Sequence, residues 1–421
     1  MSPEKVDVCV IGLGYIGLPT AVFLADAGLK VVGTDISEER LRKVASGKLP
    51  FVEPGLDTML SEVVGSGALG VSSVPVKARS FIVAVPTPVT EDKMVDYRYI
   101  DSATDSLAEV VERDDLVVLE STSPPGTTER LAQRILSSRA DLGSSLDEAP
   151  IHVAHCPERV LPGDIVNEMR TNSRVIGGVS SVAADRARQL YEAFCSGDIV
   201  VTDAKTAEMV KLVENSFRDV NIAFANELAN MCSQNGVNVW NLIEFANLHP
   251  RVNILRPGPG VGGHCIAVDP WFLVSADRDN SRLIKTAREI NDDRPRRVIE
   301  QVLTAVKENQ PRRVAVLGLA FKADIDDLRE SPALAIATSL AEHLPDEELL
   351  VCEPNVPRCP ASLAKYKNIS FDSLDECIEK ADLIVLLVDH KEFVGLRERL
   401  APSVPVIDTR GLLNSTMRSI P

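Results

Sequence analysis

The sequence lacks the features that mark several common classes of protein. Its eight cysteines form no C-x-x-C pair, so neither a zinc site nor a disulfide scaffold is expected. No run of about 18 apolar residues occurs, and no long apolar stretch follows the acidic N-terminus, so we expect neither a transmembrane helix nor a secretory signal. The net charge of −16 disfavours nucleic acid and anionic membranes as partners. We therefore expect a cytoplasmic protein with mostly buried thiols and no metal.

The order of the apolar segments indicates an α/β protein. A length of 421 residues suggests two or three domains. Short apolar runs alternate with amphipathic segments, which is typical of a parallel sheet covered by helices on both faces. The predicted strands are Val6–Ile11, Val31–Asp35, Phe81–Val85, Leu116–Glu120 and Ile151–His155, and, later in the chain, Arg313–Gly318, Leu349–Glu353, Leu383–Val388 and Val404–Asp408.

A long helical segment separates the two α/β regions. From Asp203 to Gln234 the chain has neither proline nor glycine, and Asp203 and Gly236 are suited to begin and end a helix. Such a helix is longer than a typical crossover, so it is expected to span between domains or to pack against a second copy of the chain. We expect an α/β domain over residues 1–200, a helical linker over 201–305 and a second α/β domain over 306–421.

The turn after the first predicted strand is typical of dinucleotide binding. In its G-x-G-x-x-G pattern, Gly12 permits a tight turn, Gly14 lets the backbone approach a pyrophosphate, and Gly17 lets the helix pack on the strand. Asp35 ends the second strand, where a carboxylate accepts from a ribose and repels a 2′-phosphate, so NAD is favoured over NADP. Arg40 nearby could offset that repulsion. The glycines alone could mark only a tight turn, but the strand, the helix and Asp35 together predict a dinucleotide site.

Two further loops follow predicted strands of the same sheet. They are Val85–Pro88, which contains Thr87, and Ser121–Thr128, which contains Thr122. Ligands of open α/β sheets bind at the carboxyl ends of the strands, where these loops lie. The alternative for each loop is ordinary proline-containing turn structure.

A glycine-rich loop precedes Cys265. Four glycines fall within the six residues 258–263, and ordering them is entropically unfavourable unless the backbone must come close to a ligand. A thiol at such a turn is a candidate nucleophile, and His264 could lower its pKa or merely shape the turn. The alternative for any cysteine is a small buried apolar group, which suits Cys9, Cys195 and Cys232.

The long helix carries a polar stripe. Glu208, Lys211, Asn215 and Arg218 follow one another at spacings of three, four and three residues. A polar stripe is usually a solvated face, and the sequence alone does not show what this one contacts.

Together these motifs resemble the UDP-glucose/GDP-mannose dehydrogenase family. The resemblance covers nearly the whole chain and includes G-L-G-Y-I-G-L-P, P-T-P, S-T-x-P-x-G-T-T, H-C-P-E-R, E-x-x-K-x-x-x-N, G-G-x-C and L-G-L-A-F-K. It implies two Rossmann-like doubly wound domains joined by a long-helix dimerisation domain. The first domain would bind NAD and the last a UDP-sugar.

Two segments resemble most the branch of the family that oxidises UDP-N-acetyl-D-mannosamine. They are His155–Gly163 and Gly258–Phe272. UDP-glucose dehydrogenases carry a second acid where this chain has Pro162, and S-C-F where it has His264–Ile266. UDP-N-acetylglucosamine dehydrogenases more often read G-G-H-C-I-P-I-D-P, whereas Ala267-Val268 stands here. The N-acetylglucosamine and glucose enzymes remain the alternatives.

The resemblance implies a four-electron oxidation of a C6 hydroxyl to a carboxylate. Lys211 would be the acid/base group and oxyanion stabiliser, with Asn215 as its hydrogen-bonding companion. Cys265 would add to the aldehyde, and oxidation of that thiohemiacetal would leave a thioester for water to hydrolyse. Glu158 and Asp269 are the candidates to orient that water.

The family also implies further contacts with the ligands and with a second subunit. The implied cofactor contacts are Gly12, Gly14, Tyr15, Ile16, Gly17, Asp35, Arg40, Thr87, Thr122 and Arg329. The implied substrate contacts are Arg159, Val160, Lys211, Asn215, Arg218, His249, Arg251, Gly262, Phe321 and Lys322. In the family the arginine at the position of Arg251 comes from the neighbouring subunit, which implies a homodimer or a higher homo-oligomer.

Two other functions compete with this interpretation. A non-catalytic nucleotide-sugar binder would need neither Lys211 nor Cys265. A single-step hydroxyacid-type dehydrogenase shares the Rossmann and long-helix plan but would not need the thiol in its glycine loop. The yield of NADH per substrate distinguishes them, because the four-electron enzyme forms two and the single-step enzyme one.

Overall fold

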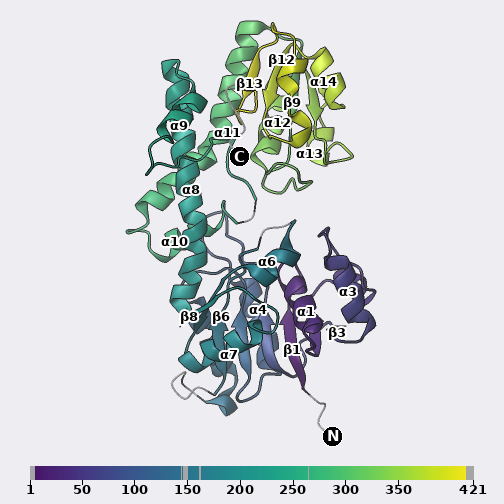
Figure 1. Cartoon of the computed structure of the whole chain (residues 1–421), viewed down its shortest axis with the longest axis vertical. Helices are drawn as coiled ribbons and strands as arrows, with labels where there is room; N and C mark the ends of the chain where they lie inside the picture. Colours follow the sequence, from purple (N-terminus) through teal and green to yellow (C-terminus); the bar gives the residue numbers. More distant parts are fainter. Residues whose placement is uncertain (1–4, 144, 146–149, 161–162, 264, 414–421) are drawn as a thin grey trace. The chain divides into compact units, whose positions relative to one another are not determined.

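The chain forms two compact units (Figure 1). The computed structural model describes residues 5–143, 145, 150–160, 163–263 and 265–413. The first unit consists of Met1–Glu214 and Trp271–Arg278, and the second of Asn215–Pro270 and Asp279–Pro421.

An eight-stranded sheet forms the centre of the first unit. Its strands are β1 (Val6–Ile11), β2 (Val31–Thr34), β3 (Leu69–Ser72), β4 (Ala78–Val83), β5 (Leu116–Leu119), β6 (His152–His155), β7 (Arg174–Gly178) and β8 (Ile199–Asp203). They lie in the order β3-β2-β1-β4-β5-β6-β7-β8. The first six strands in this order, β3 through β6, are parallel and follow the Rossmann order. β7 pairs antiparallel with β6 and parallel with β8.

Helices bury both faces of this sheet. They are α1 (Gly17–Asp26), α2 (Glu38–Ala45), α3 (Leu56–Gly65), α4 (Arg98–Ala108), α5 (Thr127–Ser138), α6 (Ile165–Thr171) and α7 (Ser181–Tyr191). Val8 and Val10 of β1 belong to a core with residues of α1, α3 and α7. The alternate residues Cys9 and Ile11 belong to a second core with residues of α4 and α5. Burial on both faces explains why the strands read as unbroken apolar runs.

Helix α8 (Ala204–Asn235) is 32 residues long and runs from the first unit into the second. At 1.5 Å per residue its length is about 48 Å. Asp203 caps it, because its Oδ1 accepts from the Thr206 amide at 2.9 Å. Gly236 follows it with φ +67°. The long helix predicted from the sequence is therefore confirmed, together with both of its end signals.

The second unit contains a five-stranded parallel sheet. Its strands are β9 (Arg313–Leu317), β10 (Glu348–Cys352), β11 (Ile369–Phe371), β12 (Leu383–Leu386) and β13 (Val406–Asp408), in the order β11-β10-β9-β12-β13. The helices that lie wholly in this unit are α9 (Val239–Ala246), α11 (Arg282–Asn309), α12 (Pro332–His343), α13 (Ala361–Ala364), α14 (Leu374–Lys380) and α15 (Leu396–Arg399). Helix α10 (Asp269–Ala276) begins in this unit and ends in the first.

The predicted α/β fold with two Rossmann-like sheets is confirmed, and the structure adds strands that the sequence did not indicate. β3, β8 and β11 are edge strands with few buried residues, so they do not read as apolar runs, and β7 ends in two glycines. The first sheet also departs from a purely parallel arrangement at β7. The dimerising role of α8 and the three domain boundaries stay predictions.

Candidate active site

Two glycines shape the turn between β1 and α1. Gly12 has φ +97°, and a Cβ there would lie 2.4 Å from the carbonyl oxygen of Ala84. A Cβ on Gly17 would lie 2.0 Å from the carbonyl oxygen of Gly12, so only glycine lets α1 begin this close to the turn. A Cβ on Gly14 would meet nothing within 4 Å among the described residues. The turn thus leaves space beside the backbone at the N-terminus of α1, as a pyrophosphate requires.

Asp35 follows β2 and is tied to the same turn. Its Oδ2 accepts from the Leu13 amide at 2.9 Å and from Arg40 Nη1 at 2.8 Å, and its Oδ1 accepts from the Ser37 amide at 2.8 Å. The Arg40 guanidinium, which the sequence left as a possible partner of a 2′-phosphate, is therefore paired with the carboxylate. This arrangement is compatible with NAD.

The loops after β4 and β5 are joined by Ser121. Its hydroxyl accepts from the Val85 amide at 2.9 Å and donates to the Val85 carbonyl at 2.7 Å. Thr87 Oγ1 and Ser123 Oγ are buried and have no hydrogen-bond partner among the residues that the structure describes. Thr122, the residue before Ser123 on the loop after β5, is half-buried. Unsatisfied hydroxyls beside central strands are groups that a bound dinucleotide can satisfy, so these residues fit NAD.

Glu208 anchors α8 to the first turn of α5, a role that sequence reasoning missed. It is 1% exposed. Its Oε2 accepts from the Gly126 amide at 2.6 Å, and its Oε1 accepts from the amide and the hydroxyl of Thr128 at 2.7 and 2.6 Å. Burial raises the pKa of this carboxyl, and the hydrogen bonds oppose that rise. The polar stripe is thus no solvated face at Glu208, and the anchor orients the turn of α8 that carries Lys211.

Lys211 is half-buried, one turn after Glu208. Arg159 reaches the next turn of the same helix, where its Nη2 and Nε donate to the two oxygens of Glu214 at 2.5 and 3.1 Å. Arg159 Nη1 also donates to the Ser173 carbonyl at 2.9 Å. The first unit therefore brings the H-C-P-E-R segment together with the part of α8 that carries Lys211.

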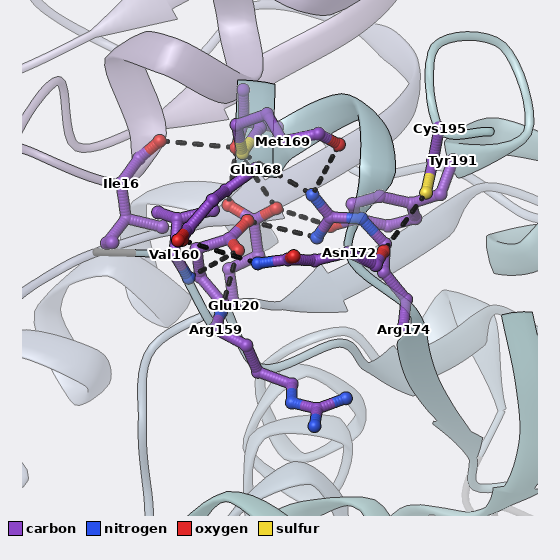
Figure 2. A network of polar contacts seen from close by, with 12 residues as sticks. Ile16, Glu120, Arg159, Val160, Glu168, Met169, Asn172, Arg174, Tyr191 and Cys195 are labelled. Atoms are coloured by element: carbon purple, nitrogen blue, oxygen red, sulfur yellow. Dashed lines mark hydrogen bonds and ion pairs between the residues drawn. The ribbon is translucent and has the colours of Figure 1, made fainter. Parts of the chain in front are cut away.

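Figure 2 shows a network of polar contacts that includes Glu120, Arg174 and Tyr191. Glu158 is buried and bonds to Arg174. Its Oε2 accepts from Arg174 Nη1 at 2.9 Å, and its Oε1 accepts from the amides of Arg159 and Val160 at 2.6 and 3.2 Å. Both oxygens of Glu158 are thus engaged by the chain itself, and they hold the backbone of two residues predicted to contact substrate. Its predicted action on water stays a prediction.

Glu120 and Tyr191 complete this network, and sequence reasoning missed both of them and Arg174. Tyr191 donates to Glu120 Oε1 at 2.6 Å, and Thr20 donates to both oxygens of Glu120. Burial, followed by the charge of Glu158, raises the pKa of Glu120 to about 8. Nothing in the spacing of these residues signals that they meet.

The glycine-rich loop packs closely against the loop that follows β9. A Cβ on Gly262 would lie 2.5 Å from the carbonyl oxygen of Glu330, and a Cβ on Gly263, which has φ +80°, would lie 3.0 Å from the ring of Phe321. The sequence attributed these glycines to a close approach to a ligand, but the close approaches in the structure are to the protein itself. Phe321 therefore contacts the loop that carries Cys265, and Lys322 beside it is exposed.

Cys265 is the exposed cysteine of this chain, whereas six others are buried and Cys359 is intermediate. Its carbonyl accepts from the Asp269 amide at 2.8 Å, in a turn that leads into α10. Asp269 is 3% exposed, and its Oδ2 accepts from Asn215 Nδ2 at 2.5 Å. The second unit therefore links Asn215, Asp269 and the thiol loop, and the catalytic roles of these residues stay predictions.

The other predicted substrate contacts of this region lie on the surface. Arg218, His249 and Arg251 are exposed, and His249 Nδ1 accepts from the Arg251 amide at 3.3 Å. Asn247 closes their loop through hydrogen bonds with the amide and carbonyl of Ile254. A contribution of Arg251 to a neighbouring subunit stays a prediction.

The turn after β9 repeats the pattern of the turn after β1 with a different acid. Glu353 Oε2 accepts from the Leu319 amide at 2.7 Å, just as Asp35 accepts from Leu13, but it also accepts from His390 Nε2 at 3.0 Å. Burial favours a higher pKa for Glu353, but its hydrogen bonds outweigh that effect and lower the pKa to about 2. The second donor to the acid is the partly exposed Arg40 in the first sheet and the buried His390 in the second.

Some predicted features have other partners or lie outside the described residues. Arg329 pairs with Asp327 at 2.6 Å on an exposed part of the loop after β9. Tyr15 stacks on Phe51 with ring centroids 4.1 Å apart, and Ile16 is the residue before α1. Pro162 and His264, which distinguished the sugar branches in the sequence, lie outside the described residues.

Comparisons with known proteins cover almost the whole chain. The UDP-glucose/GDP-mannose dehydrogenase family matches in three parts: its NAD binding domain over residues 6–195, its central domain over 205–293 and its UDP binding domain over 315–415. Within the described part of the chain, no helix is both long enough and apolar enough to cross a membrane.

Full-length relatives are similar to this chain. UDP-N-acetyl-D-mannosamine dehydrogenase of Campylobacter jejuni is 48% identical over 394 residues, which cover 93% of this chain and 97% of the relative. NDP-N-acetyl-D-galactosaminuronic acid dehydrogenase of Ralstonia nicotianae is 48% identical over 408 residues, 96% of each chain. A solved structure of UDP-N-acetyl-mannosamine dehydrogenase from Staphylococcus aureus has a TM-score of 0.85 at 39% identity and covers 97% of this chain and 96% of its own.

Proposed function

This chain belongs to the UDP-glucose/GDP-mannose dehydrogenase family, and we propose that it oxidises the C6 hydroxyl of UDP-N-acetyl-D-mannosamine to a carboxylate with NAD. The observation that carries the proposal is the exposed thiol of Cys265, on a glycine-rich loop joined to Asn215 through Asp269. A protein that only bound the nucleotide sugar would not need a nucleophile there.

The proposed reaction has a covalent stage on Cys265. Bound NAD supplies the hydride acceptor, once for the alcohol and once for the thiohemiacetal. Lys211 takes the hydroxyl proton as the aldehyde forms and stabilises negative charge on its oxygen. The sulfur of Cys265 then bonds to the aldehyde carbon, and the oxygen receives the thiol proton. Loss of a hydride from the carbon of this thiohemiacetal, and of its hydroxyl proton to solvent through Lys211, leaves a thioester. Water then adds to the thioester carbon and the C–S bond breaks, which gives the carboxylate and the free thiol.

Asn215 and Asp269 support this stage through their contact with each other. Asn215 follows Lys211 by one turn of α8, and Asp269 lies buried at the start of α10, four residues after Cys265. A buried carboxylate at this point can orient a water or hold the amide of Asn215 toward the substrate. We assign the water-orienting role to Asp269 first, because it lies four residues after Cys265 and contacts Asn215.

The identity of the sugar rests on the motifs and on the relatives. The segments around Cys265 resemble the N-acetyl-D-mannosamine branch, and the Campylobacter relative bears that name. The Ralstonia relative has the same identity to this chain and is named for N-acetyl-D-galactosaminuronic acid, so a galacto substrate is the second candidate. Both are 2-acetamido sugars, which separates them from UDP-glucose.

The test compares UDP-sugars with the purified enzyme. We expect the highest kcat/KM with UDP-N-acetyl-D-mannosamine among the N-acetylmannosamine, N-acetylgalactosamine, N-acetylglucosamine, glucose and galactose forms, with two NADH formed per sugar. A higher kcat/KM with the galacto substrate would correct the sugar. Cys265→Ser should stop net uronate formation, and two NADH per sugar from that variant would refute the covalent stage.

The predicted homodimer is part of the proposal. One side of α8 exposes a row of apolar residues, with Val213 at 49%, Phe217 at 68%, Phe224 at 52% and Met231 at 56% exposure. An exposed apolar row of this length is typical of an interface with another protein chain. Phe217→Glu is expected to convert a dimer into monomers in sedimentation experiments, and a fully active monomeric wild-type enzyme would argue against the dimer. The cytoplasmic location stays a prediction.

A further inference from the structure

A row of polar side chains joins α8 to α11 in the second unit. Asp219 and Asn226 of α8 and Arg288 and Asn291 of α11 are each at most 1% exposed, and Arg294 is 8% exposed. Such groups are unfavourable between helices unless they are hydrogen-bonded, and apolar residues of similar volume would often pack there equally well. We call the set the α8–α11 polar seam, and its members are Asp219, Asn226, Asn230, Arg288, Asn291 and Arg294.

Hydrogen bonds connect most of the seam into one network. Arg288 Nη1 and Asn291 Nδ2 donate to Asp219 Oδ1 at 2.5 and 2.8 Å. Asn226 Nδ2 donates to Asn291 Oδ1 at 2.9 Å. Arg294 donates to Asn230 one turn further along α8. Since these side chains share partners, the loss of one disturbs its neighbours.

The seam also holds the backbone of the loop that carries Cys265. Asn226 Oδ1 accepts from the Gly258 amide at 2.9 Å, and Arg294 Nε donates to the Gly258 carbonyl at 2.9 Å. At the other end, Arg288 Nη1 lies 3.5 Å from the Ile266 carbonyl, at the outer limit of a hydrogen bond. Gly258 begins the glycine run and Ile266 directly follows Cys265, so the seam contacts both ends of the loop.

Arg294 is the member that helix packing explains least. No carboxylate of the described residues forms an ion pair with it, and burial lowers its pKa to about 10. A buried guanidinium without a counter-ion destabilises the fold. Its hydrogen bond to the Gly258 carbonyl is a contact that an apolar residue could not make.

We propose that the α8–α11 polar seam positions the thiol of Cys265, with Asn226 and Arg294 as positioning residues for the covalent stage. The inference rests on the covalent role proposed for Cys265. The part of α8 that carries Lys211 is held by a different anchor, the contact of Glu208 with Thr128 in the first unit. Seam variants should therefore slow the oxidation that passes through the thiol and spare the first hydride transfer.

Arg294→Met removes both donors, and Arg297→Met is its matched control. Arg297 is three residues later on α11, is 46% exposed and pairs with Asp293, away from the thiol loop. With UDP-N-acetyl-D-mannosamine, single-turnover NADH formation should show a first phase within about twofold of wild type in Arg294→Met. The second phase should be about 10- to 100-fold slower, because misplacing a reacting group by about 1 Å has effects of that size.

Hydrogen exchange supplies a readout that does not depend on turnover. Peptides covering residues 255–268 should exchange faster in Arg294→Met than in the control, while the KM for NAD stays unchanged. Asn226→Ala removes the acceptor of the Gly258 amide and carries the same test if Arg294→Met does not fold. Arg294→Lys keeps the charge and should recover part of the second phase.

The outcomes separate this inference from the proposed function. Equal slowing of both phases, or wild-type second-phase rates in a folded seam variant, would overturn the positioning role. If Cys265→Ser stops after one NADH while the seam variants behave as wild type, only the seam inference fails. If Cys265→Ser still forms two NADH, the covalent stage itself is wrong.

Discussion

Glu208→Gln tests whether a single buried carboxylate holds α8 in place. In the wild-type structure the two oxygens of Glu208 accept three hydrogen bonds from Gly126 and Thr128, each 2.6 to 2.7 Å long. The amide oxygen of glutamine can keep the two bonds from Thr128, but its NH2 group then faces the Gly126 amide, which is also a donor. One charge-assisted hydrogen bond is lost and one buried N–H is left without an acceptor.

The expected destabilisation follows from those two changes. A hydrogen bond to a charged group contributes about 1.5–3 kcal/mol, and an unsatisfied buried donor costs about 1–3 kcal/mol. Allowing for partial relaxation, we expect the free energy of unfolding to fall by about 2–4 kcal/mol. Since Lys211 lies one turn further along α8, kcat should fall about tenfold or more.

Glu227→Gln is the matched control, because Glu227 lies on the same helix with an exposed side chain. That substitution should change the free energy of unfolding by less than about 0.5 kcal/mol. Urea denaturation followed by circular dichroism measures stability, and hydrogen exchange at Gly126 and Thr128 reports the local contact. If Glu208→Gln matches the control in unfolding midpoint, amide exchange and kcat, the anchoring argument is refuted.

Three further predictions concern the cofactor turn, the buried acid of the first unit and the thiol loop. Asp35→Ala should raise the NAD concentration needed for half-maximal rate several-fold, because it removes the predicted ribose acceptor and the partner of the Leu13 amide. An unchanged half-maximal NAD concentration in initial-rate titrations would count against that role. Because burial raises the pKa of Glu120 from 4.5 to about 8, its contribution to stability is complete below pH 4.5 and is lost as pH rises through 8. The urea midpoint of the wild type should therefore fall relative to that of Glu120→Gln between about pH 5 and 9, whereas parallel curves would contradict the shift. Gly263→Ala places a Cβ 3.0 Å from the Phe321 ring at φ +80° and should lower the free energy of unfolding by about 1–3 kcal/mol. The control Gly65→Ala adds a Cβ that meets nothing within 4 Å among the described residues, so its melting temperature should be close to that of the wild type. Equal melting temperatures for the two variants would disprove the strain at Gly263.

Features that depend on neighbouring residues in the chain could be derived from the sequence. The apolar runs predicted most strands of both sheets, because parallel strands are buried on both faces. The G-x-G-x-x-G turn and Asp35 predicted the NAD site, because turn geometry and strand length together fix where the acid falls. The end signals at Asp203 and Gly236 predicted α8, since helix capping is a local interaction.

Features that depend on which buried groups meet were decided only by the tertiary structure. Glu158 stays a candidate for orienting water, but the sequence did not show that its oxygens accept from Arg174 and two backbone amides. The sequence left open what the polar stripe on α8 contacts, and the structure shows that Glu208 binds the start of α5, 80 residues earlier in the chain. The pairing of Asn226 with Gly258 had no signal in the spacing of the residues. A sequence shows which side chains can donate or accept, but burial and partner are set by packing between distant segments, and these decide whether a carboxylate does chemistry or holds the fold.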